Sequence, residues 1–251
     1  MLPLAAHSYN GWRSVAAVLG LSWALVACAP LPPGHQGHTV GQMQLALPPG
    51  DWQDLGTSAQ SWPLLPELGA SLPLQTRTWA LRQGEAWQAL VWLQTTHHRS
   101  APALDPTMWT DTCPRQPDVW VQDATDGSPV RIDCLRFKRA ANRSEIWMER
   151  NHPALQQWLQ TQAPGLPQPY AHISYRYANA GGAYVQITLL VDERLLLPNR
   201  GNHADYLRSG ELGRQWAQQL RASVLQAVGR VDQQLVLPAF PVLGEPKPPV
   251  L

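Results

Sequence analysis

The chain has 251 residues, with 19 Lys and Arg against 18 Asp and Glu, and charged residues make up only 15% of it. A formal net charge of +1 gives no electrostatic reason to expect nucleic acid or an anionic surface as a partner. The length suits one good-sized domain or two small ones. The 12 tryptophans are spread along the chain. Tryptophans spread in this way usually fill cores and sheet faces, and a platform for carbohydrate or peptide is the alternative.

The first predicted element is an export leader at residues 1–27. The basic residue Arg13 precedes the apolar run Val15–Ala27, which ends in small residues. A helix needs about 20 apolar residues to cross a bilayer, and this run is shorter. Prolines at positions 30, 32 and 33 would end a helix soon afterwards. The pattern favours a cleaved signal over a transmembrane helix, and cleavage without lipid attachment is a second alternative.

The end of the run, Leu25-Val26-Ala27-Cys28, resembles the lipobox of bacterial lipoproteins. The resemblance implies diacylglyceryl transfer to the Cys28 thiol, cleavage after Ala27 and acylation of the new amino terminus. Several acyl chains would anchor the protein stably, whereas a single chain binds reversibly. Ala29 stands where an Asp would signal retention in the inner membrane. The resemblance therefore implies a position at the periplasmic face of the outer membrane.

Residues 28–40 are rich in Pro, Gly and His and predict a flexible tether between the anchor and the folded part. Two further cysteines follow, Cys113 and Cys134. In an oxidising compartment such a pair most simply forms one disulfide. The bridge would close a loop of about twenty residues and stabilise the fold by about 3 kcal/mol. A redox pair or metal thiolates are alternatives, although the sequence has no Cys-x-x-Cys motif and no histidine near either cysteine.

Strands are predicted from residue 42 to residue 138. Alternating apolar residues indicate a first strand at 42–47, and no firm prediction is made for 53–73. Two hairpins follow, one of strands 76–82 and 85–96 around Gln83-Gly84, the other of strands 119–122 and 130–138. Ile132 and Cys134 would share one face of the last strand, with Leu135 and Phe137 on the other.

A short strand at 145–149 comes next, followed by a helix that begins at His152-Pro153 with Asn151 as its N-cap and ends at Pro164. Residues 170–177 and 183–192 flank Asn179-Ala180-Gly181-Gly182 and predict a third hairpin.

The last predicted element is a long amphipathic helix. It begins at Ser209, or one turn earlier near Asp205, and Gly229 lies just past its end as a C′ glycine. Its apolar stripe consists of Leu212, Trp216, Leu220, Val224 and Ala227. The proline-rich segment 238–251 follows and predicts an irregular or polyproline II tail. Such a tail could dock in an aromatic groove, or it could simply be loose.

Together these elements predict a single α+β domain at residues 41–237: a mostly antiparallel sheet with one short and one long amphipathic helix packed on it. The order of elements resembles that of small antiparallel αβα sandwiches of the Mog1/PsbP type. The resemblance concerns the fold alone, since no motif is shared.

No motif for catalysis, for a metal or for a cofactor is found, and we predict neither catalytic residues nor cofactor. His97 and His98 would point to opposite faces of one strand. His35 and His38 lie in the predicted tether. Ser174 and Ser209 lack the surroundings of a nucleophile, and His203 with Asp205 suits the start of a helix better than a catalytic dyad. Five acids lie around the predicted disulfide and suit solvated turns better than a catalytic pair: Asp111, Asp118, Asp123, Asp126 and Asp133.

These observations predict a lipid-anchored envelope lipoprotein that acts as a non-enzymatic accessory or binding module. Its partners would be the membrane, through the lipid on Cys28, and an envelope protein. An exported hydrolase with a site built from scattered Asp and His residues is the alternative. A third hypothesis is a role in membrane-protein assembly through the proline-rich tail.

Overall fold

We describe the fold from a computed structural model of the chain. The structure describes residues 37–65, 70–96, 112–128, 130–143, 145–162, 166, 169–197, 201–230 and 232–241. The fold is α+β and its sheets are mostly antiparallel, as the sequence predicts. The leader, Cys28 and the residues that follow it up to Gln36 lie outside the described residues.

The central element is a seven-stranded sheet in which every neighbouring pair of strands is antiparallel. Its strand order is β3-β4-β5-β9-β8-β7-β6. The strands are β3 (Asp51–Leu65), β4 (Ala70–Gln83), β5 (Ala86–Thr96), β6 (Trp120–Asp123), β7 (Val130–Lys138), β8 (Tyr170–Asn179) and β9 (Tyr184–Asp192). The three predicted hairpins correspond to β4–β5, β6–β7 and β8–β9.

A second, three-stranded sheet joins the beginning and the end of the described chain. Its strands are β1 (His38–Val40), β2 (Met43–Ala46) and β10 (Gln234–Val236). β10 pairs with β2 in the parallel direction, with Leu235 opposite Leu45. β1 includes three residues that the sequence assigned to the tether, because Val40 is fully buried in the core and fixes this segment.

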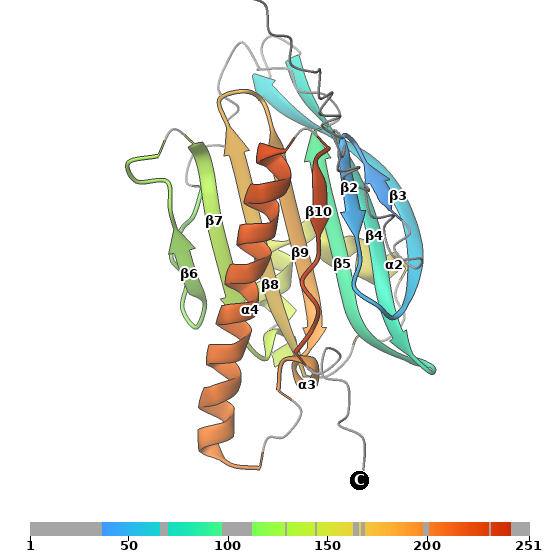
Figure 1. The fold of residues 1–251 in the computed structure, drawn as a ribbon, viewed down its shortest axis with the longest axis vertical. Coiled ribbons are helices and arrows are strands. Elements are labelled where there is room, and N and C mark those ends of the chain that lie inside the picture. The colour runs from blue at the N-terminus through green and yellow to red at the C-terminus, as the bar shows by residue number, and fades with distance from the viewer. Residues whose placement is uncertain are drawn as a thin grey trace, which may run out of the picture. The chain divides into compact units, whose positions relative to one another are not determined.

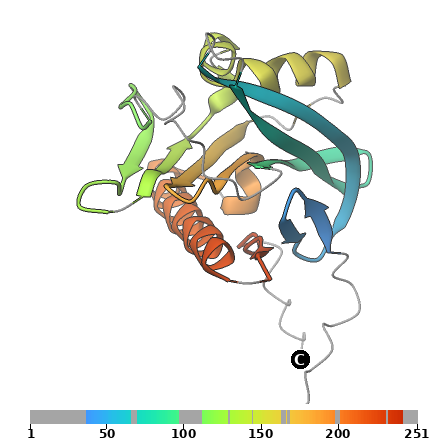
Figure 2. The ribbon, with the colours of Figure 1, turned by 90° about the horizontal axis from the view of Figure 1, so that it is seen from above.

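Helices cover both faces of the large sheet (Figures 1 and 2). They are α1 (Glu145–Asn151), α2 (Pro153–Gln162), α3 (Glu193–Leu196) and α4 (His203–Gly229), with a 3-10 turn at Ala141–Arg143. Figure 2 shows α1 and α2 on one side of the sheet, and α4 with the small sheet on the other. The described chain thus forms three layers: the helices α1 and α2, the large sheet, and α4 with the small sheet.

The main core lies between α4, the small sheet and the large sheet. The predicted stripe of α4 faces it, since Trp216, Leu220 and Val224 are buried there. On the other face of the sheet, Trp92 and Leu190 pack against Met148 and Leu155 of α1 and α2. Both faces of the central strands are therefore covered, and β7 is buried from Ile132 to Lys138.

The structure also corrects predictions about two of the helices. Residues 145–149 form helix α1 and not a strand, because Met148 packs beside Leu155 in the helix layer and Glu, Met and Arg are good helix formers. Asn151 therefore ends α1 and does not cap α2. Helix α4 begins at His203, before either predicted start, because the Asn202 side chain accepts a hydrogen bond from the Asp205 amide and caps it.

The predicted tail is corrected as well. Its first residues are packed, since Phe240 is fully buried and its ring stacks on Trp216 with centroids 5.1 Å apart. The Trp216 indole N–H also donates to the Ala239 carbonyl at 3.0 Å. The structure describes the chain as far as Pro241, and residues 242–251 lie outside the described part.

Candidate functional site

The predicted disulfide between Cys113 and Cys134 is present, with the two Cα atoms 5.4 Å apart. Cys134 lies on β7 and is buried beside Leu74, Ile132 and Tyr184. The bond therefore fastens the segment before β6 to the sheet. The predicted lipidation site Cys28 lies outside the described residues, as do Asp111, His35, His97 and His98.

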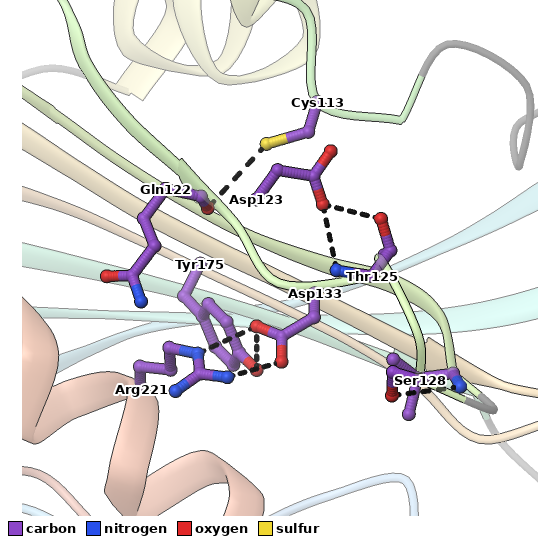
Figure 3. A network of polar contacts seen from close by, with 9 residues as sticks. Cys113, Gln122, Asp123, Thr125, Ser128, Asp133, Tyr175 and Arg221 are labelled. Atoms are coloured by element: carbon purple, nitrogen blue, oxygen red, sulfur yellow. Dashed lines mark hydrogen bonds and ion pairs between the residues drawn. The ribbon is translucent and has the colours of Figure 1, made fainter.

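Asp133, on β7, is the centre of a buried polar network that links the sheet to α4 (Figure 3). Arg221 of α4 donates to both carboxylate oxygens, at 2.8 Å from Nε and 2.5 Å from Nη2. The Tyr175 hydroxyl donates to the same carboxylate at 3.0 Å. Burial and then the nearby Asp133 carboxylate raise the pKa of Tyr175, so this hydroxyl keeps its proton at physiological pH. The network suits fixing α4 on the sheet better than proton transfer.

The other described acids near the disulfide have separate surroundings. Asp123 accepts hydrogen bonds from the backbone N–H and the hydroxyl of Thr125, at 3.1 and 2.6 Å, which is a local turn contact. Asp126 is exposed in the turn before β7, as predicted for a solvated acid. Asp118 is exposed and has a backbone φ of 57°, a left-handed conformation that is uncommon for residues other than glycine.

A cluster of rings that the sequence did not predict lies under α1 and α2. His172 of β8 is 1% exposed, and neither ring nitrogen has a hydrogen-bond partner among the described residues. Its ring lies 4.7 Å from Trp147 and 4.9 Å from His152, measured between centroids. The Lys138 ammonium lies 5.5 Å from the centroid of the Trp147 ring.

Both imidazoles of this cluster are neutral at physiological pH. Burial, followed by the charges of Arg136 and Arg176, lowers the pKa of His152 from 6.5 to about 3. Burial, followed by the effect of His152, holds the pKa of His172 well below 6.5. Neutral imidazoles can bind metals, but the adjacent Arg136 and Lys138 cations oppose a metal ion. The described part of the chain contains no group of three or more His, Cys, Asp or Glu suited to a metal.

A groove lies between β6 and the first half of α4, with a volume of about 370 Å³. Trp120 of β6 and Phe137 of β7 form one side, and Tyr206 and Leu207 of α4 form the other. Tyr206 and Leu207 are 45% and 58% exposed, so they present apolar surface to solvent. The full lining consists of Asp118, Trp120, Phe137, Arg139, Tyr206, Leu207, Gly210 and Arg214.

The close approach of β7 to α4 shapes this groove. A Cβ atom at Gly213 would lie 2.4 Å from the Phe137 ring, so glycine lets the ring meet the helix backbone. Arg139 donates to the Tyr206 carbonyl, and its guanidinium lies 3.6 Å from the centroid of the Tyr206 ring. This cation–π contact fixes the ring at the edge of the groove. Ala140, next to Arg139, has a φ of 45°, a left-handed conformation like that of Asp118.

His203 and Asp205 lie in the first turn of α4, as predicted for the start of a helix. Asp205 accepts a hydrogen bond from the Gly201 amide at 3.1 Å, and His203 stacks near Tyr206. Ser209 is buried, and its hydroxyl donates to the Tyr206 carbonyl at 2.7 Å. Ser174 is buried in the middle of β8. The contacts of His203, Asp205 and Ser209 are local ones at the start of α4.

Within the described residues, no helix has the length and apolar character that crossing a membrane requires. Comparison of the chain with known protein families, with curated proteins and with solved structures finds no match.

Proposed function

We propose that this chain is a bacterial envelope lipoprotein whose folded domain is a non-enzymatic binding module. A diacylglyceryl group on Cys28 anchors it, and the folded domain stands at the periplasmic face of the outer membrane. The leader and the sequence Leu25-Val26-Ala27-Cys28 support the anchor. One acyl chain binds a membrane reversibly, and the two or three chains of a lipoprotein hold it there.

The observation that carries the proposal is the distribution of the three cysteines. Cys113 and Cys134 are bonded to each other, which agrees with an oxidising compartment such as the periplasm. The bond leaves Cys28 as the one cysteine whose thiol is not consumed by the disulfide. Cys28 is also the cysteine that follows the apolar leader, where lipid transfer takes place in lipoproteins.

The binding role is supported by the groove between β6 and α4. Exposed aromatic and aliphatic side chains that line a groove are typical of interaction surfaces. The buried acid among those that could suggest a hydrolase, Asp133, is held in structural contacts with Arg221 and Tyr175. This contact and the groove support binding as the proposed role.

Replacing Cys28 tests the anchor. In its bacterial host, the full chain should incorporate labelled palmitate and enter the detergent phase on phase separation with a non-ionic detergent. The variant Cys28→Ser should lose the label and move to the aqueous phase. The matched control is the double variant Cys113→Ser/Cys134→Ser, which should keep the label. Equal labelling of the wild type and Cys28→Ser would contradict the proposal.

A further inference from the structure

We propose that the groove between β6 and α4 binds the proline-rich segment 242–251 of this same chain. This inference goes beyond the anchored module, and it does not depend on the lipid. The segment contains Pro246-Lys247-Pro248-Pro249, which has the P-x-x-P spacing of polyproline II ligands. Such ligands dock in aromatic-lined grooves, because their extended helix is already formed before binding.

The groove has the chemistry that such a segment requires. Trp120 and Phe137 on the sheet side and Tyr206 on the α4 side supply aromatic surfaces to the groove. Gly210 lines the groove without a side chain, and the Arg139 side chain packs over it, since a Cβ atom there would lie 3.4 Å from Arg139 Nη1. The Arg139 contact holds the Tyr206 ring in place, so little side-chain freedom is lost when the groove is filled.

The charges of the groove match those of the segment. Asp118 carries a negative charge on the β6 side, and Arg139 carries a positive charge towards α4, where Arg214 is paired with Glu211. The segment carries one charge of each sign, Glu245 and Lys247, on either side of Pro246. A segment placed along the groove can direct Lys247 to Asp118 and Glu245 to Arg139. This pairing gives the segment one preferred direction.

The position of the segment's first residues makes binding within one chain geometrically accessible. Phe240 stacks on Trp216, so the chain leaves the folded part beside α4, the helix that also forms one wall of the groove. In polyproline II conformation each residue advances about 3.1 Å, so ten residues span about 31 Å. A helix with its side chains is about 10–12 Å wide. The segment can therefore pass around α4 and reach β6.

Competition with a labelled peptide tests this inference. The probe is a fluorescent peptide with the sequence of residues 242–251, and its binding is followed by polarisation. It should bind the chain shortened after Pro241, and it should bind the full chain at least ten times more weakly. The reason is that the chain's own segment is present at a high effective concentration. If the shortened chain does not fold, the full-length variant Pro246→Ala/Pro249→Ala replaces it. Its own segment should no longer occupy the groove, so this variant should bind the labelled peptide.

Variants in the groove locate the binding site. Tyr206→Ala/Leu207→Ala should reduce peptide binding to the shortened chain at least tenfold, and both side chains are exposed enough for the fold to tolerate the change. The matched control is Val236→Ala, which removes an exposed apolar side chain on β10 and should leave binding unchanged. A peptide that binds neither chain, or binds both equally, overturns the inference. The inference is also overturned if light scattering shows that the full chain is a dimer held together by the segment. The segment would then bind the groove of a second copy and not that of its own chain.

Discussion

Asp133 and Arg221 show how a single ion pair fixes the position of a helix. The carboxylate is 4% exposed, and three hydrogen bonds from Arg221 and Tyr175 replace the water that it loses on burial. A carboxylate buried in this way destabilises the fold if its partner is removed, since the remaining charge is then left uncompensated.

We predict that Asp133→Asn lowers the free energy of unfolding by about 3 kcal/mol, the lower end of the range for buried pairs, because a quarter of the Arg221 side chain is exposed. Arg221→Met should cost a similar amount, and the double variant should cost less than the two single changes together. Urea unfolding of the four proteins measures the coupling. The control Asp232→Asn breaks an exposed ion pair with Arg230 and should not move the midpoint. If the losses of the two single variants simply added up to the loss of the double variant, Asp133 and Arg221 would not stabilise the fold as a pair.

His152 makes the stability of the fold depend on pH. Its pKa is about 3 in the folded chain and near 6.5 when unfolded, so the unfolded chain binds a proton first as the pH falls. Stability should be unaffected by this group above pH 6.5 and should fall progressively as the pH drops from 6.5 towards 3. The slope is at most about 1.4 kcal/mol per pH unit for one group. His172, whose pKa is lowered too, adds a loss in the same direction.

We predict that His152→Gln flattens this dependence between pH 6.5 and 4, as measured by the urea midpoint at each pH. The exposed His203, in the first turn of α4, offers the matched control, and His203→Gln should leave the slope unchanged. A slope that stays the same in His152→Gln would contradict the lowered pKa of this imidazole.

At the scale of elements, the contact between β7 and α4 depends on Gly213. We predict that Gly213→Ala destabilises the protein by about 1–3 kcal/mol, although alanine is the better helix former, because the new Cβ atom would overlap the Phe137 ring. Thermal unfolding measures the change. The control is Gly229→Ala at the end of the same helix, where nothing lies within 4 Å of a new Cβ atom. A stabilised Gly213→Ala would contradict the close packing.

The elements that the sequence predicted well are those with a clear local period. The hairpin of β8 and β9 is set by alternation and by turn residues, and the stripe of α4 by its spacing of about four residues. Helix α1 was missed because a short segment with three consecutive apolar residues, Ile146-Trp147-Met148, fits a short strand as well as a helix. Its packing against Leu155, which no local pattern shows, decides in favour of a helix.

Other features depend on contacts between distant residues. The long strand β3 has a mostly exposed, polar sequence with Pro63, since it is an edge strand and needs no continuous apolar face. The pairing of β10 with β2 joins the two ends of the domain. The polar residues His172 and Ser174 of β8 suggest that one face of this strand is exposed to solvent. Both residues are buried, because the helix layer of α1 and α2 covers that face.

The candidate sites also differ in whether a local sequence pattern or contacts between distant residues determine them. The disulfide could be predicted because cysteine pairing follows from the compartment and from an even number. The groove could not, since Trp120 and Tyr206 come together only when β6 and α4 pack on β7. The sequence offered one signal for it, the two exposed apolar residues Tyr206 and Leu207 in the first turns of an amphipathic helix.

At the scale of the whole molecule, the disulfide ties the segment before β6 to a sheet that is otherwise held by packing. We predict that Cys113→Ser/Cys134→Ser lowers the free energy of unfolding by about 3 kcal/mol, because the bond closes a loop over a sequence separation of 21 residues. Urea unfolding measures the loss, and reduction of the wild type should reproduce it. Cys28→Ser should have no effect on unfolding. Unchanged stability after reduction would contradict this prediction.

The central claim of this account is the covalent attachment of lipid to the first residue of the processed chain. Mass spectrometry of the amino-terminal peptide, isolated from the protein's own host, tests it most directly. We predict a peptide that begins at Cys28 and carries a thioether-linked diacylglyceryl group. A peptide with a free Cys28 thiol, or one in which the leader is still attached, would contradict the claim.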